Sequence, residues 1–131
     1  MSVEHDDLLE AARSAGRSAY CPYSNFRVGA AVLAGGRTFS GANIENASYG
    51  LTICAERTAA FAAVLADAGP IEVVAVACLD APDDAEPALL MPCGACRQVL
   101  AEFAKPGATV HVDRVGTFLL TDLLPSAFRL R

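Results

Sequence analysis

Three cysteines and one glutamate have the types and the spacing of a metal site. Cys93 and Cys96 form a C-x-x-C pair at the start of a predicted helix, 94–104, and Cys54 comes directly before the predicted helix 55–68. Residues three apart lie on one face of a helix, so both sulfurs of the pair can reach one ion. The partial positive charge of a helix N-terminus favours thiolate over thiol. We interpret the three cysteines as ligands of zinc, which is redox-silent and suited to soft sulfur.

The number of candidate ligands indicates a catalytic site. A structural zinc is closed by four protein ligands, and the remaining candidates, His5 and His111, have no helpful spacing. An open fourth position would hold water. Glu56 follows Cys54 by two residues, about 200° around a helix, so both cannot face one ion from a helix interior. If Cys54 lies at or just before the first turn, Glu56 can lie beside the metal and take a proton from that water.

Two arginines follow the cysteines closely along the chain, Arg57 and Arg97. Three thiolates on Zn²⁺ leave the ligand shell with a net negative charge, which makes a bound water less acidic. A guanidinium that donates to the sulfurs would offset this charge. We assign that role to Arg57 first, with Arg97 as the alternative.

Other interpretations of these residues remain open at this level. The three cysteines could be buried structural thiols, and the C-x-x-C could be a redox pair, although a redox pair would leave Cys54 unexplained. Glu56 could be a solvated helix glutamate. We expect Cys78, inside an apolar run, to pack in the core.

The order of predicted elements indicates an α/β fold, a three-layer α/β/α domain with a mixed central sheet of about five strands. Hydrophobic periodicity and turn residues predict three helices and five strands. The predicted helices are 4–19, 55–68 and 94–104, with one further turn before Pro125, and the predicted strands are 27–34, 37–43, 71–79, 108–112 and 117–120.

Composition excludes several classes of protein. A length of 131 residues with 53% hydrophobic side chains fits one domain, residues 1–131, with a packed core. The formal net charge is −5 and the basic residues are scattered, which argues against a nucleic-acid partner. No apolar run approaches the roughly 20 residues of a membrane span, and the acidic N-terminus lacks a signal core, so we expect a cytoplasmic protein.

Four sequence blocks carry a family resemblance that extends along nearly the whole chain. They are "PYSNFRVGAA" (22–31), "GANIENASYGLTICAER" (41–57), "PCGACRQVL" (92–100) and "LLPSAF" (123–128). Together they resemble the short, homotetrameric, zinc-dependent cytidine deaminases, in the form where a cysteine replaces histidine as the first ligand. The segment from Asp80 to Met91 looks longer than this family leads us to expect.

The resemblance implies a role for each matching residue. Cys54, Cys93 and Cys96 would hold one Zn²⁺ per subunit, and Glu56 would be the proton shuttle. The nucleoside would be bound by Phe26, by Asn43 and Glu45 at the ribose hydroxyls, by the backbone of Ala55, and by Tyr49 and Phe128 reaching a neighbouring subunit's site. Ordinary core packing is the alternative role for Phe26 and Phe128.

The implied activity is hydrolytic deamination of cytidine and 2′-deoxycytidine to the uridine products with release of ammonia, a reaction of pyrimidine salvage. Two alternatives remain at this level. One is a deaminase of another aminopyrimidine nucleoside such as blasticidin S. The other is a zinc-stabilised binding module without turnover.

Overall fold

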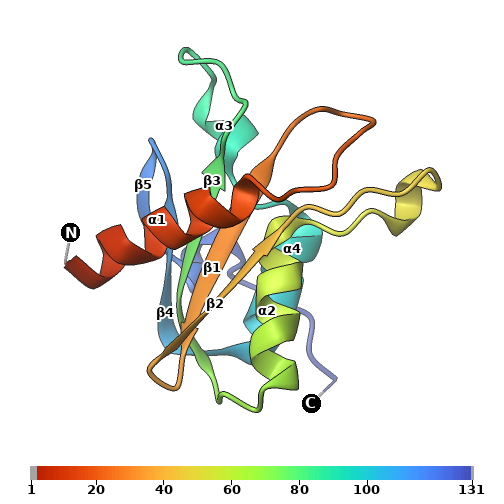
Figure 1. Ribbon diagram of the computed structural model, residues 1–131. Coiled ribbons are helices and arrows are strands. Elements are labelled where there is room, and N and C mark those ends of the chain that lie inside the picture. Colours follow the sequence, from red (N-terminus) through yellow and green to blue (C-terminus); the bar gives the residue numbers. More distant parts are fainter. Residues whose placement is uncertain (1–2, 131) are drawn as a thin grey trace.

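A central sheet of five strands carries the helices on both of its faces in the computed structural model, which describes residues 3–130 (Figure 1). The strands lie in the order β2-β1-β3-β4-β5; β3 and β4 are parallel and the other neighbours antiparallel. They are β1 Val28–Ala34, β2 Arg37–Ala42, β3 Ile71–Cys78, β4 Ala104–Val112 and β5 Gly116–Leu119. The predicted mixed sheet of about five strands is confirmed.

The helices form the outer two layers (Figure 1). Helix α1 packs against one face of the sheet, and α2, α4 and α5 pack against the other. The helices are α1 Val3–Gly16, the short 3₁₀ helix η1 Tyr49–Leu51, α2 Ala55–Leu65, α3 Pro87–Leu90, α4 Gly94–Phe103 and α5 Leu120–Leu123. Within residues 3–130, no helix is both long and apolar enough to cross a bilayer.

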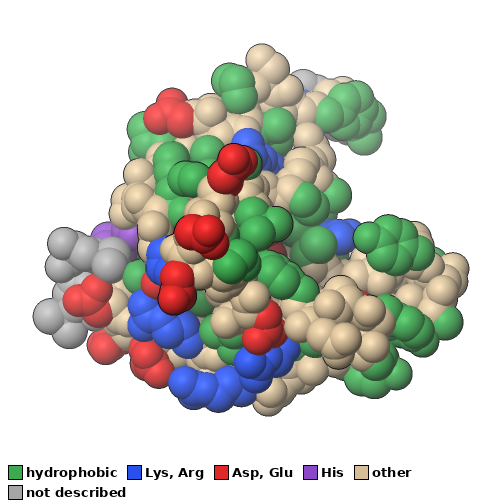
Figure 2. Space-filling model, turned by 90° about the horizontal axis from the view of Figure 1, so that it is seen from above, with side chains coloured by type: hydrophobic (Ala, Val, Ile, Leu, Met, Phe, Trp, Pro, Cys, Tyr) green, Lys and Arg blue, Asp and Glu red, His purple; other side chains and the backbone are tan. Residues whose placement is uncertain are grey.

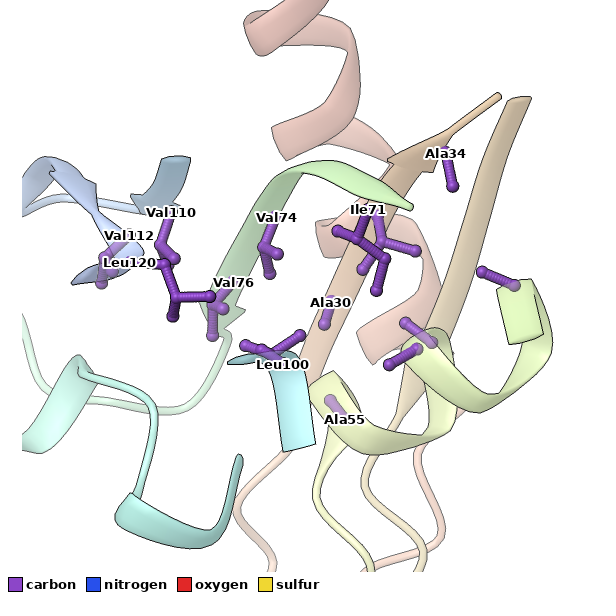
Figure 3. Packing of buried hydrophobic residues seen from close by; sticks show 14 of the residues in the cluster. Ala30, Ala34, Ala55, Ile71, Val74, Val76, Leu100, Val110, Val112 and Leu120 are labelled. Atoms are coloured by element: carbon purple, nitrogen blue, oxygen red, sulfur yellow. The ribbon is translucent and has the colours of Figure 1, made fainter. Parts of the chain in front are cut away.

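Small side chains bring α2 close to the sheet. The alanines on its inner face are almost fully buried and pack on the side of β1 that carries Ala30 and Val32. Leu100 of α4 fills the adjoining space next to Val76 of β3 (Figure 3). Alanine buries a modest area, but it loses no side-chain entropy and allows close packing. The N-terminal ends of α2 and α4 are therefore fixed side by side.

Two glycines allow the helices to approach the strands. A Cβ atom at Gly29 of β1 would overlap the carbonyl oxygen of Ala12 in α1. A Cβ atom at Gly41 of β2 would overlap the Thr58 hydroxyl and lie 2.5 Å from the backbone nitrogen of Ala59, both in α2. These two glycines set the spacing between the layers, one on each face of the sheet.

The structure differs from the sequence prediction at the ends of several elements. Helix α4 passes directly into β4 at Ala104, whereas the sequence predicts a strand that begins only at residue 108. The pairing of β3 with β4 shifts register there, so the Pro106-Gly107 turn residues lie in an irregular start of the strand. Helix α1 ends at Gly16 rather than at residue 19, and α3 was not predicted.

We predict that Gly29→Ala destabilises the fold without touching the site. The added methyl group has no space against α1, and overpacking of this kind costs about 1–3 kcal/mol. The measurement is the thermal midpoint at fixed protein concentration. Gly50→Ala is the matched control, because nothing lies within 4 Å of the position that its Cβ atom would occupy. Equal midpoints for the two variants would contradict the prediction.

Candidate active site

The three cysteines converge at the N-terminal ends of two helices. Cys54 and Cys93 are the extended residues that directly precede α2 and α4, and Cys96 lies in the first turn of α4. Their sulfur atoms all lie within 4.8 Å of one another, and those of Cys93 and Cys96 are 3.5 Å apart. Zinc–sulfur bonds of about 2.3 Å in a tetrahedron require sulfurs roughly 3.8 Å apart. The donor set therefore fits one zinc ion, as the spacing predicted.

The sulfur cluster favours negative charge at one sulfur and opposes it at the next. The pKa of Cys54 is lowered to about 5, first by the neighbouring Cys96 thiol and further by the Arg57 guanidinium. The pKa of Cys96 is raised by Cys54 and by burial. Adjacent thiolates repel each other, so full ionisation of the cluster requires a cation among the sulfurs.

The two arginines have different positions. Arg57 donates from Nη2 to the sulfur of Cys54 at 3.3 Å. Its Nε is buried and has no hydrogen-bond partner among the described residues. Arg97 instead donates to the carbonyl oxygens of Pro92 and Leu123, at 2.8 and 2.9 Å. Arg57 is therefore in position to offset sulfur charge, while Arg97 fixes the backbone that leads into the second ligand pair.

Glu56 is buried beside the cluster, with only 4% of its surface exposed. Removal from water disfavours the carboxylate, so burial, and to a lesser extent the sulfur of Cys54, raise the pKa of Glu56 to about 7. Two residues inside a helix at this spacing would point to different sides. Cys54 and Glu56 avoid this because Cys54 lies outside α2, in extended conformation. A solvated helix glutamate is thereby excluded.

A cavity of about 180 Å³ opens next to the cluster and reaches Cys54, Glu56 and Cys93. Its walls are mainly apolar and come from β1, β3 and the segment around α3. The other lining residues are Phe26, Val28, Asn43, Thr52, Ala55, Val76, Cys78, Leu89, Leu90 and Met91.

Part of this cavity was not foreseen from the sequence. Leu89, Leu90 and Met91 form one wall, and only the apolar letters before "PCGAC" hinted at it. Cys78 packs against the core, as expected, but it is only partly buried and also lines the cavity at the end of β3. Burial raises the pKa of Cys78 to about 11, so this thiol stays neutral at pH 7.

Two of the three polar residues of the "NIEN" motif hold the segment that carries Phe26. Asn43 accepts from the backbone nitrogen of Val28 at 2.9 Å and donates to the carbonyl oxygen of Phe26 at 2.8 Å. Glu45 accepts from the backbone of Tyr23 and Ser24 and from the Ser24 hydroxyl. Phe26 itself is partly buried and lines the cavity.

The remaining predicted residues lie in different surroundings. Ala55 is fully buried at the start of α2 and lines the cavity. Tyr49 and Phe128 are 89% and 69% exposed and lie outside the lining of the cavity beside the cluster, so Phe128 is not a core aromatic. The rings of His5 and His111 contact each other at an angle of 41°, with their centroids 4.0 Å apart. Neither belongs to the metal-binding cluster found among residues 3–130.

The site has three sulfur ligands and a cavity that reaches them. This arrangement is that of a catalytic zinc protein, since a structural zinc is closed by four protein ligands. The sequence profile described as "Cytidine and deoxycytidylate deaminase zinc-binding region" matches residues 2–112. The chain belongs to this family.

Individual relatives agree with that membership. A cytidine deaminase of Halalkalibacterium halodurans is 46% identical over 131 residues, which cover 96% of this chain and 95% of the relative. A cytidine deaminase of Mycobacterium tuberculosis is 46% identical over 130 residues, covering 98% and 92%. The crystal structure of cytidine deaminase from Burkholderia pseudomallei superposes with a TM-score of 0.82 at 44% identity, covering 98% of this chain and all of that one.

We predict that Cys93→Ala loses zinc and stability. Removal of one of three sulfurs breaks the cluster, and metal binding is coupled to folding in such sites. Zinc per chain is measured by elemental analysis after dialysis, and stability by the thermal midpoint. Cys21→Ala is the control, because Cys21 is a buried thiol outside the cluster. Equal zinc content in both variants would refute the ligand assignment.

We predict that Arg57→Gln weakens zinc binding by about 10–100-fold, the usual effect of losing a partner that contacts a ligand. Competition with a chromophoric chelator at pH 7 measures the affinity. Arg97→Gln should leave zinc affinity nearly unchanged and lower only the thermal midpoint, because its hydrogen bonds go to carbonyl oxygens. If Arg97→Gln weakened zinc binding more than Arg57→Gln, Arg97 would be the residue that offsets the sulfur charge.

Proposed function

We propose that the protein catalyses the hydrolytic deamination of cytidine and 2′-deoxycytidine to uridine and 2′-deoxyuridine, with release of ammonia. One observation carries the proposal: a buried carboxyl, Glu56, lies beside a three-sulfur cluster at a cavity, in a chain of the cytidine deaminase family. Near-complete coverage of cytidine deaminases at 46% identity supports it.

Cys54, Cys93 and Cys96 would hold the zinc ion. When bound there, zinc lowers the pKa of water and so supplies a nucleophile at neutral pH. Arg57 offsets part of the sulfur charge, which keeps that effect strong despite three anionic ligands. The positive ends of α2 and α4 act in the same direction.

Glu56 moves the protons. Its carboxylate takes a proton from the attacking water and delivers it to N3 of the pyrimidine, while the water oxygen forms a bond to C4. Glu56 then carries the second proton of that water to the 4-amino group. The C4–N bond breaks, ammonia leaves, and C4 keeps the oxygen as the carbonyl of uridine. A buried carboxyl with its pKa raised to about 7 can both accept and return a proton near neutral pH.

Residues of the cavity, together with Glu45 outside its lining, would bind the nucleoside. Phe26 packs on it, the backbone of Ala55 contacts the pyrimidine, and Asn43 and Glu45 hold the ribose hydroxyls. Both polar side chains are already oriented by hydrogen bonds to the segment 23–28. The amide and the carboxylate retain further acceptor and donor capacity for a diol. Such preorganisation lowers the entropy lost on binding.

We further propose a homotetramer whose subunits share their sites through Tyr49 and Phe128. Exposed hydrophobic side chains support this, because monomers rarely expose large apolar patches. Several of them lie on the projecting segment around η1 and on the neighbouring segment before β1, where Figure 2 shows a hydrophobic group at one end of the molecule. The residues concerned are Tyr23, Ile44, Tyr49 and Leu51.

We assign the reaction to pyrimidine salvage in the cytoplasm. Thiolate ligands require a compartment that keeps cysteines reduced, and all five cysteines of the chain are free.

The test follows ultraviolet absorbance of cytidine, 2′-deoxycytidine and blasticidin S with the zinc-loaded protein, with and without chelator. We expect turnover of the two cytosine nucleosides, none of blasticidin S, and loss of activity with chelator. A folded zinc protein that releases no ammonia from either nucleoside would contradict the proposal and favour the binding module. Turnover of blasticidin S alone would identify the other deaminase.

In the same assay, Glu56→Gln should keep zinc and lose kcat by at least about 10²–10⁴-fold, because general acid–base transfers have that magnitude. Elemental analysis and the thermal midpoint are the controls for metal content and folding. Near-normal turnover by this variant would overturn the mechanism.

A further inference from the structure

The two walls of the cavity leave the sheet at neighbouring strand ends. Val28 begins β1 and pairs with Cys78, which ends β3. The segment before β1 carries Phe26, and the segment after β3 leads to α3 with Leu89 and Leu90; all three of these side chains line the cavity. Both segments rise from the same end of the sheet (Figure 1).

A three-point contact joins the two segments where they part. The Asp80 carboxylate accepts from the backbone nitrogen of Arg27 at 2.7 Å, from its Nε at 2.9 Å and from its Nη2 at 2.8 Å. Leu79 donates its backbone N–H to the Arg27 carbonyl at 2.9 Å. These hydrogen bonds from Arg27 lower the pKa of Asp80 to about 2, so the carboxylate is ionised at neutral pH.

The contact fixes Phe26 from the side opposite Asn43. Asn43 binds the Phe26 carbonyl and the Val28 nitrogen, and Asp80 binds the Arg27 nitrogen between them. Three consecutive residues are thus held by side chains from two directions. A shift of Phe26 away from the cavity has to break hydrogen bonds on one side or the other.

The same contact fixes the start of the other wall. Asp80 opens the segment to Met91, and the next two carbonyl oxygens, of Ala81 and Pro82, accept from the Arg114 guanidinium at 3.4 and 3.3 Å. The segment then returns through α3 to the cavity. Asp80 is therefore hydrogen-bonded to the segment that carries Phe26 at the point where the chain leading to the α3 wall begins.

We propose that Asp80 is a positioning residue for nucleoside binding, which sets the width of the cavity by tying the Phe26 wall to the α3 wall through Arg27. This inference rests on the proposed function. Asp80 is not among the residues that line the cavity, and among residues 3–130 its side chain is hydrogen-bonded to Arg27. Loss of the Asp80 carboxylate weakens binding of the nucleoside equally in the ground state and in the transition state. The proton transfers stay intact.

The test compares Asp80→Ala and Asp80→Asn in steady-state deamination of cytidine. We expect KM to rise about tenfold for Asp80→Ala, because hydrogen bonds to a charged group contribute free energy of that size. The value of kcat should stay within about twofold, which is the pattern seen when ground state and transition state lose the same binding energy. Asp80→Asn should show a smaller rise, because an amide oxygen still accepts from the Arg27 backbone. Glu72→Ala is the matched control: it breaks a similarly exposed ion pair, with Lys105 at 3.1 Å, near the other end of β3.

Two further arms make the inference specific. In a Phe26→Ala background, Asp80→Ala should raise KM less than it does in the wild-type protein, because the part of its effect that passes through Phe26 is already lost. A crystal structure of Asp80→Ala should show a displaced Phe26, a readout that requires no activity. An unchanged KM and an unchanged Phe26 would overturn the inference. Absence of deamination by the wild-type protein would instead overturn the proposed function.

Discussion

The repulsion among three sulfurs next to a buried carboxyl is the constraint on which the rest of the structure depends. Cys54 and Cys96 cannot both carry charge unaided, because ionisation of one raises the pKa of the other. Glu56 adds a further group that burial keeps from ionising easily. Negative charge at this site is stabilised by two helix N-termini, by the Arg57 guanidinium and by the place for a divalent cation. Each must be held within a few ångströms of the others.

That requirement explains the packing of the helical layer. The starts of α2 and α4 can meet only if α2 lies close on β1 and β2, and the buried alanines and Gly41 provide this closeness. The sheet is therefore more than a scaffold of suitable size. Its small residues determine where Cys54 lies relative to Cys93, and so whether the sulfurs converge on one ion.

Short-range chemistry could be predicted from the sequence, while long-range contacts could not. The spacing of Cys93 and Cys96, and the conflict between Cys54 and Glu56, were enough to place Cys54 just outside a helix. By contrast, the sequence ranks Arg57 before Arg97 but cannot give the partner of Arg97 at Leu123, which depends on how the C-terminal segment packs. The wall at α3 was missed because four residues are too few for a periodic signal. Pro106 and Gly107 suggested a turn, but a shift in register places them within β4.

The connection between β3 and α4 has a consequence for how such proteins diversify. One of its ends is tied to Arg27 and the other to α4, so the zinc ligands do not depend on the number of residues between. Because Cys93 and Cys96 belong to the start of α4, a change in the length of this connection acts first on the apolar wall formed by Leu89 to Met91. Substrate preference and catalysis can therefore vary separately over evolutionary time, with the ligand helices retained and this one connection rewritten.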